Sequence, residues 1–206
     1  MKKDKRRTIL RAAELIFRGR RFHEVHLDDV AAAARVGKGT IYLYFSDKED
    51  LFLKVMTDGF LDLEDRLAKV AASDKPVGAK LCAFGETLTA VLKERHMIIP
   101  AIMSPEFARK RPDARSVLKS HHDRLDSILA GILEEGVRAG GIRADADINM
   151  FICAFIGGLH GLARRRKRDS RRLPVRELVA LLLEGAQPGR VADDGKRKKQ
   201  HLQDRP

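Results

Sequence analysis

The sequence predicts an all-α fold, and three observations support this prediction. Apolar residues recur at intervals of three and four along most of the 206-residue chain, and this spacing places them on one face of an α-helix. Glycine and proline lie between the periodic segments. No run of alternating β-branched residues is long enough to indicate a sheet. We therefore expect helices joined by short loops.

Three short helices are expected near the N-terminus, over about residues 5–19, 27–36 and 38–45. The first has an apolar stripe at helical spacing, formed by Ile9, Ala13, Ile16 and Phe17. The second would bury Leu27, Val30, Ala31 and Ala34. It also carries Asp28 and Asp29 in its first turn, where the helix dipole favours negative charge.

The second and third segments have the lengths and the glycine-containing turn of a helix-turn-helix, braced by the first segment. In that motif the second helix enters the major groove of DNA. Ile41 and Phe45 must face the core, because they lie four residues apart. The residues left to face outward are Lys38, Thr40, Leu43 and Tyr44. Tyr42 lies beside the inward pair, so we expect its ring to pack while its hydroxyl reaches solvent.

A longer helix is expected from Ser46 to about residue 72. The run Ser46-Asp47-Lys48-Glu49 has the form of a capping box, in which the Ser46 hydroxyl caps an amide near Glu49 and Glu49 reaches back. The core positions of this helix would be Leu51, Val55, Leu63, Leu67 and Val70. Further helical segments are expected over 76–95, 97–103 (interrupted by prolines), 113–139, 147–166 and 174–185.

The net charge of +12 is concentrated at the two ends of the chain. Residues 1–46 carry 11 Lys and Arg against 5 Asp and Glu, residues 164–206 carry 14 against 6, and the centre is close to neutral. Basic ends suit a polyanion-binding head, because Lys and Arg that neutralise phosphates release counterions. A charged surface kept for solubility explains the same numbers equally well.

The chain is expected to be soluble and cytoplasmic. Cys82 and Cys153 lie far apart in apolar stretches, which is typical of reduced thiols that pack as small hydrophobes. The N-terminus lacks the apolar core of a signal peptide. The longest apolar run, at residues 150–163, is shorter than the roughly 20 residues that a membrane helix needs.

The first-helix pattern ILRAAELIF, Phe22, the pair Val30-Ala31 and the run VGKGTIYLYFSDKEDLF at 36–52 resemble the N-terminal DNA-binding domain of the TetR (tetracycline-repressor-like) family of bacterial regulators. The resemblance covers about residues 6–55. It implies that Lys38, Gly39 and Thr40 contact bases or backbone, and that Tyr42, Tyr44 and Lys48 contact phosphates. Arg35 stands where the family usually has a glycine; it can add a phosphate contact, and the turn would then rely on Gly37.

The resemblance also implies a helical ligand-sensing and dimerisation domain after the DNA-binding domain. We expect a DNA-binding domain over residues 1–46, a helical effector-binding and dimerisation domain over 47–187, and a basic, unstructured tail over 188–206. The segment 147–166 carries the small residues Ala154, Gly157, Gly158 and Gly161, and the segment 174–185 presents Leu178, Leu181 and Leu182. Two such helices from each subunit would form an isologous four-helix homodimer interface. Alternatively, the glycines pack within one subunit.

Interior apolar residues of the second domain are candidates for an effector pocket, although an apolar stripe at helical spacing is more often plain core than the lining of a pocket. No charged residues converge among them, which favours a small apolar or aromatic effector. The candidates are Phe60, Phe84, Leu88, Met97, Ile102, Met103, Phe107, Leu125, Phe151 and Phe155.

Metal and catalytic sites are not expected. His121 and His122 are adjacent on a helix, so their side chains diverge by about 100° and suit chelation poorly. No nucleophile stands at a useful spacing from a base. We therefore expect no catalytic residue, no metal and no cofactor, and we do not expect an enzyme.

Two functions remain open at this stage. The first is a sequence-specific transcriptional regulator, a repressor that a small effector releases from a pseudo-palindromic double-stranded DNA operator. The second is an effector-independent, DNA-organising or non-specific DNA-binding protein that uses the same head and its basic tails. The basic run at 164–172 would be either a solvated connection or an auxiliary phosphate contact.

Overall fold

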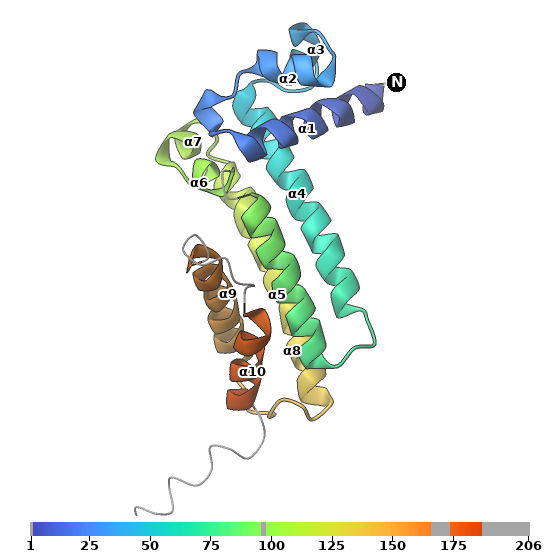
Figure 1. The fold of residues 1–206 in the computed structure, drawn as a ribbon, viewed down its shortest axis with the longest axis vertical. Helices are drawn as coiled ribbons and strands as arrows, with labels where there is room; N and C mark the ends of the chain where they lie inside the picture. The colour runs from blue at the N-terminus through green and yellow to red at the C-terminus, as the bar shows by residue number, and fades with distance from the viewer. Residues whose placement is uncertain (1, 96–97, 166–173, 187–206) are drawn as a thin grey trace, which may run out of the picture. The chain divides into compact units, whose positions relative to one another are not determined.

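The computed structural model is built of α-helices, which confirms the predicted fold class (Figure 1). The structure describes residues 2–95, 98–165 and 174–186. These residues form ten α-helices and one 3₁₀ turn, η1, and contain no strand. In chain order they are α1 (Lys2–Gly19), η1 (Phe22–Glu24), α2 (Leu27–Ala34), α3 (Lys38–Tyr42), α4 (Lys48–Ala71), α5 (Val77–Glu94), α6 (Ile98–Ile102), α7 (Pro105–Lys110), α8 (Ala114–Arg138), α9 (Ile148–Arg165) and α10 (Val175–Ala186).

Helix α7 was not predicted from the sequence, because it begins at Pro105 and a proline inside an apolar segment is typical of a break in a helix. Proline is well suited to the first position of a helix, where its missing N–H is not needed. Ser104 caps this helix, since its hydroxyl accepts a hydrogen bond from the Phe107 amide at 3.2 Å. The Ser-Pro-Glu sequence therefore starts a helix here.

The chain forms two compact units. The first consists of residues 1–69 and 87–126, and the second of residues 70–86 and 127–206. The division falls within α4, α5 and α8. The boundary predicted after residue 46 lies inside the first unit and stays a prediction. The tail at 188–206 and residues 166–172 of the basic run lie outside the described residues.

An aromatic cluster forms the centre of the first unit. The Phe52 ring of α4 lies 4.8 Å from the Phe17 ring of α1, 4.8 Å from the Phe22 ring of η1 and 5.4 Å from the Phe107 ring of α7, centroid to centroid. The rings of Phe52 and Phe107 meet edge to face, an arrangement that adds about 0.5–1.5 kcal/mol to the area that the rings bury. The cluster therefore fixes the first helix, the following turn and α7 onto the start of α4.

A buried arginine joins α1, α4 and α5 within the same unit. Arg95 follows the last residue of α5, and its Nη2 donates to Glu14 Oε1 of α1 at 2.7 Å. Its guanidinium lies against Gly59 of α4, where a Cβ would stand 1.9–2.0 Å from three guanidinium atoms. Burial lowers the pKa of Arg95, although Glu14 opposes the effect. Glycine, a poor helix former, is therefore needed inside α4 to make room for this side chain.

In the second unit, helices α9 and α10 pack on each other through a glycine. A Cβ on Gly158 would come within 2.9 Å of the Leu178 side chain, so Gly158 packs within one subunit, as the alternative interpretation proposed. A Cβ on Gly157 or Gly161 would meet nothing within 4 Å, so these two glycines leave one side of α9 open. Phe84 and Phe155 are fully buried in this unit with ring centroids 6.2 Å apart.

Gly59→Ala is predicted to destabilise the protein by about 2 kcal/mol, because the new methyl group displaces the guanidinium of Arg95 and breaks its ion pair with Glu14. Thermal or urea unfolding measures the effect. Gly131→Ala in α8 is the matched control: its Cβ meets nothing within 4 Å, so better helix propensity should stabilise the chain by up to about 1 kcal/mol. Equal stabilisation by both substitutions would contradict the role given to Gly59.

Candidate nucleic-acid interface

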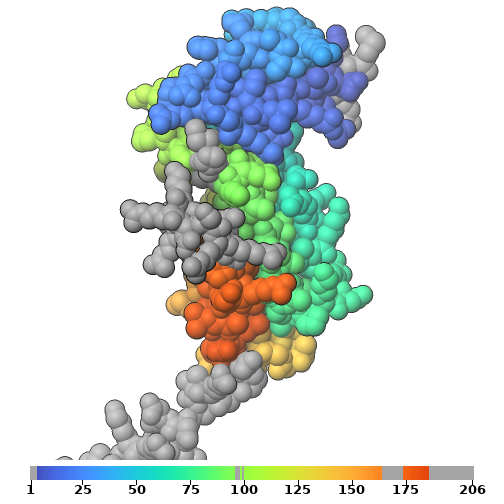
Figure 2. Space-filling view, viewed as in Figure 1, coloured from blue at the N-terminus to red at the C-terminus, as the bar shows by residue number. Residues whose placement is uncertain are grey.

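Helices α2 and α3 form a helix-turn-helix that packs on α1. Figure 2 shows α2 and α3, in lighter blue, forming one continuous surface with the darker α1. The predicted inward face is confirmed: Val30, Ile41 and Phe45 are at most 2% exposed. Because these residues anchor both helices in the core, the opposite face of α3 is presented at the surface in a fixed orientation.

The turn between α2 and α3 depends on Arg35, and the expectation that it relies on Gly37 is wrong. Arg35 has φ 54° and ψ 45°, in the left-handed region, whereas Gly37 has an ordinary φ of −71°. Among the described residues, Arg35 is the one non-glycine residue with a positive φ. A side chain in this conformation costs on the order of 1–2 kcal/mol. The exposed Arg35 side chain is thus kept at a position that glycine would occupy without strain.

The exposure of the two tyrosines is the reverse of what the sequence predicted: Tyr42 is the exposed one and Tyr44 the partly buried one. Tyr42 ends α3 and is 52% exposed. Tyr44 packs partly buried against the core, with its ring 6.5 Å from that of Phe45. Leu43 is 79% exposed, as expected for an outward residue. The surface of α3 therefore presents Lys38, Gly39 and Tyr42 together, with Thr40 partly exposed.

Two carboxylates at the start of α2 form ion pairs with basic residues from other segments of the first unit. Lys38 Nζ lies 2.9 Å from Asp28 Oδ2, and Arg20 Nη1 lies 2.9 Å from Asp29 Oδ2. The hydrogen bond with Asp28 raises the pKa of Lys38 above its ordinary value. From the sequence alone, both acidic residues relate only to the helix dipole, because their partners lie on other segments.

Lys48 is turned toward the protein backbone. Its ammonium donates to the carbonyl oxygens of Phe22 and Val25, both at 3.0 Å, and lies 4.5 Å from the centroid of the Phe22 ring. Partial burial lowers its pKa. An ammonium has three N–H donors, and these two hydrogen bonds use two of them. The side chain also fixes the turn η1 onto the first turn of α4.

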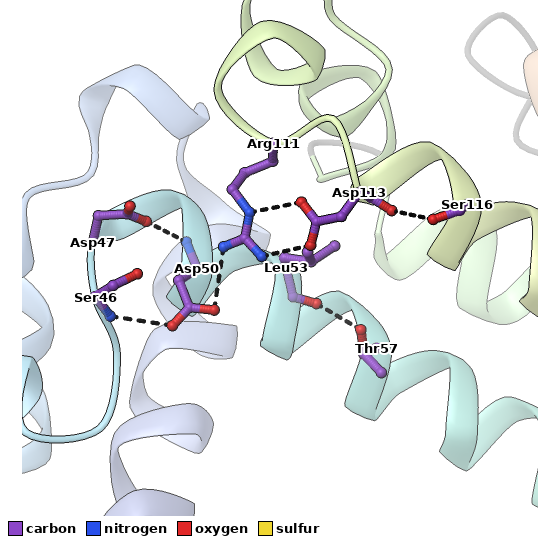
Figure 3. A network of polar contacts seen from close by, with 8 residues as sticks. All are labelled: Ser46, Asp47, Asp50, Leu53, Thr57, Arg111, Asp113 and Ser116. Atoms are coloured by element: carbon purple, nitrogen blue, oxygen red, sulfur yellow. Dashed lines mark hydrogen bonds and ion pairs between the residues drawn. The ribbon is translucent and has the colours of Figure 1, made fainter.

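The start of α4 is capped one residue later than predicted (Figure 3). The Asp50 amide donates to Asp47 Oδ1 at 2.6 Å, and the Ser46 amide donates to Asp50 Oδ2 at 3.1 Å. Asp47 therefore takes the capping role expected of Ser46, and Asp50 takes that expected of Glu49. Arg111 extends the network by donating to Asp50 at 3.2 Å and to Asp113 at 2.8 Å.

Glu49, which is buried, pairs instead with Lys110 of α7 at 2.6 Å. Burial has the largest single effect on the pKa of Glu49 and raises it. The hydrogen bond from Lys110, a backbone hydrogen bond and the nearby charges of Lys110 and Lys48 together outweigh burial, so the pKa lies below its ordinary value. The first turn of α4 is thus joined to α7 and to the segment that follows it by two ionic contacts, from Glu49 and from Asp50.

Residues 9–55, which include the whole helix-turn-helix and its capped α4 start, match the family model described as bacterial regulatory proteins, tetR family. Residues 9–55 therefore carry a DNA-binding domain of the TetR type. The chain is 27% identical over 151 residues to the HTH-type transcriptional repressor KstR2 of Rhodococcus jostii, covering 72% of this chain and 73% of that protein.

Solved structures share the fold. The fatty acid degradation regulator FadR of Bacillus halodurans superposes with a TM-score of 0.70 at 22% identity, over 88% of this chain and 95% of that one. FadR of Bacillus subtilis, solved in complex with stearoyl-CoA, superposes with a TM-score of 0.66 at 21% identity, over 86% and 95% of the two chains. With this DNA-binding domain, the protein is a DNA-binding transcriptional regulator.

The residues expected to line an effector pocket fall into separate sets. In the first unit, the Phe60 ring stacks on His121 at 4.9 Å, Leu88 and Leu125 are buried, Phe107 belongs to the aromatic cluster, and Met103 is 69% exposed. In the second unit, Phe84, Phe151 and Phe155 pack together. Met97 lies outside the described residues.

Beside Phe60, His121 Nδ1 contacts Glu64, whose other carboxylate oxygen accepts from Arg124 at 3.2 Å. These polar groups were not anticipated, because they lie on different helices. No group of His, Cys, Asp and Glu in the described part of the chain is arranged to hold a metal ion. None of the described helices is long and apolar enough to cross a membrane.

Arg35→Gly in this regulator is predicted to stabilise the fold by about 1 kcal/mol, because glycine adopts the left-handed conformation without steric cost. The melting temperature should rise by roughly 2–4 °C. Arg35→Asn is the companion variant, because asparagine tolerates this conformation better than arginine does and keeps a side chain. A fall in melting temperature for both variants would show that the Arg35 side chain stabilises the turn.

Proposed function

We propose that this regulator is a homodimeric repressor that binds a pseudo-palindromic operator and is released from it by a small apolar or aromatic effector. The observation that carries the proposal is the exposed polar face of α3, held in place by Ile41 and Phe45. A short helix anchored in this way can enter the major groove with its side chains at fixed positions. The relative KstR2 is itself named as a repressor.

In this proposal the contacts divide by type. Lys38, Gly39 and Thr40 at the start of α3 contact bases or the adjoining backbone. Exposed Tyr42 and exposed Arg35 contact phosphates, which position the protein without reading sequence. Tyr44 and Lys48 are more buried, so each reaches a phosphate with one polar group, a hydroxyl or the remaining N–H, while the rest of the side chain packs.

Dimerisation is proposed to use the open side of α9 together with α10. Met150 and Leu181 are 66% and 68% exposed, and Gly157 and Gly161 leave the surface of α9 flat. Exposed apolar residues beside small ones suit close helix packing between two copies. A two-fold dimer presents two α3 helices, which explains why the operator should be pseudo-palindromic.

The effector is proposed to act through α4. This helix carries the capped DNA-proximal turn at Asp47 and, three turns later, Phe60 beside His121. A ligand that packs against Phe60 and prefers a different tilt of α4 would move the helix-turn-helix, because Phe52 and Lys48 attach the head to the same helix. The stearoyl-CoA bound in the FadR structure has an apolar acyl chain joined to a charged coenzyme A part, and the acyl chain supports an effector with a large apolar portion. Effector-independent DNA binding is the weaker alternative, since it leaves this arrangement without a role.

Selection of duplexes from a random library should enrich a pseudo-palindrome whose half-sites lie about one helical turn apart. Lys38→Ala should change the selected sequence, whereas Tyr42→Phe should weaken binding to all duplexes and leave the selected sequence the same. Lys119→Ala, which makes the same charge change on α8, is the control. Selection of no sequence at all, with affinity set by salt alone, would favour the non-specific alternative.

Effector binding and operator binding should weaken each other by the same factor, because linkage is reciprocal. Stearoyl-CoA and a panel of flat aromatic compounds are first compared by their effect on the melting temperature. Calorimetry on the free protein and on its operator complex then gives the two affinities of each hit; a tenfold difference corresponds to about 1.4 kcal/mol of coupling. Equal affinities would mean that effector binding does not change the affinity of the helix-turn-helix for DNA.

A further inference from the structure

The start of α2 contains a charge arrangement that the DNA contacts proposed above do not use. Asp28 and Asp29 are neighbours in the first turn of α2, and each holds a cation from another segment of the head. Asp28 holds Lys38, the first residue of α3, and Asp29 holds Arg20, which follows α1. In the Asp28–Lys38 pair, the side chains are 65% and 50% exposed, so both groups are accessible to DNA.

Lys38 is the one basic residue within the described helix α3, whose sequence is KGTIY. A free ammonium binds any phosphate, and every DNA sequence presents phosphates at the same spacing. An ammonium held by a carboxylate must exchange that acceptor for one on the DNA. After the exchange Asp28 has lost its partner and lies close to a polyanion, which repels it.

We propose that Asp28 is a specificity-determining residue, which acts by withholding Lys38 from DNA phosphates. The exchange is compensated where a base edge offers Lys38 strong acceptors, as the N7 and O6 atoms of guanine do in the major groove. At other sequences no such acceptor replaces the carboxylate, and the repulsion between Asp28 and the backbone is uncompensated. The inference rests on the assignment of α3 as the helix that enters the major groove.

The test measures Asp28→Asn, Lys38→Ala and the double variant on two duplexes over a range of salt concentrations. One duplex has random sequence, and the other is the sequence that the unaltered protein selects from a random library. Asp28→Asn should bind the random duplex roughly threefold to tenfold more tightly. For this variant, the slope of log affinity against log salt concentration should become steeper by about 0.9, the value for one additional phosphate contact. Affinity for the selected duplex should change less, so the specificity ratio falls.

Asp29→Asn is the matched control, because it lies in the same helical turn, makes the same charge change and pairs with Arg20 instead of Lys38. The steeper salt slope of Asp28→Asn should vanish when residue 38 is alanine, whereas any effect of Asp29→Asn should persist. Asp28→Ser serves as a second variant, and melting temperatures establish that each protein is folded.

The proposal is overturned if Asp28→Asn leaves the affinity for random DNA and the salt slope unchanged. It is also overturned if the steeper slope persists without Lys38, or if Asp29→Asn has the same Lys38-dependent effect, since net charge then explains the result. These outcomes are separate from failure of the proposed function. A protein that selects no sequence is not a sequence-reading regulator, whereas one that selects a sequence but ignores Asp28 disproves only the inference.

Discussion

The packing of Phe52 against Phe17, Phe22 and Phe107 sets the position of the helix-turn-helix in this regulator. Phe52 is 1% exposed and lies in the second turn of α4. That helix also carries the capping residues at its start and Phe60 further along. Helices α2 and α3 have few residues of their own, and helices this short are marginal in isolation. Their orientation therefore depends on an aromatic contact made by a helix outside the DNA-binding motif.

Polar contacts around the same turn of α4 orient the segments that the packing of Phe52 holds together. Lys48 holds the two carbonyls of the η1 region, Glu49 holds Lys110, and Asp50 holds both the Ser46 amide and Arg111. Each contact orients a different neighbouring segment. The aromatic cluster supplies most of the burial. Because hydrogen bonds are directional and apolar packing is not, the polar contacts fix the rotation of α4 about its axis.

The periodic features of the fold could be predicted from the sequence, and the features that depend on partners distant in sequence could not. Ile41 and Phe45 were assigned to the core correctly, because four-residue spacing on a helix determines their direction. Tyr44 was misplaced because its ring packs partly buried beside that of Phe45, a side-chain contact that residue spacing does not predict. The cap at Asp47 was missed because Ser46 and Asp47 are both good N-caps. In the structure Asp47 is the cap, and Asp50 accepts a hydrogen bond from Arg111, which lies 61 residues away in the sequence.

Basic residues around the helix-turn-helix divide into those that are bound by protein groups and those that are not. Lys38 and Arg20 are paired with carboxylates, and Lys48 is bound to backbone carbonyls. Arg7, Arg11 and Arg35 are exposed and have no ion pair among the described residues. Unpaired charges contribute to the long-range attraction that brings DNA to the protein. In the proposal for Asp28, Lys38 contributes only where the DNA replaces its carboxylate partner at short range, and only there do the acceptors of different base pairs differ.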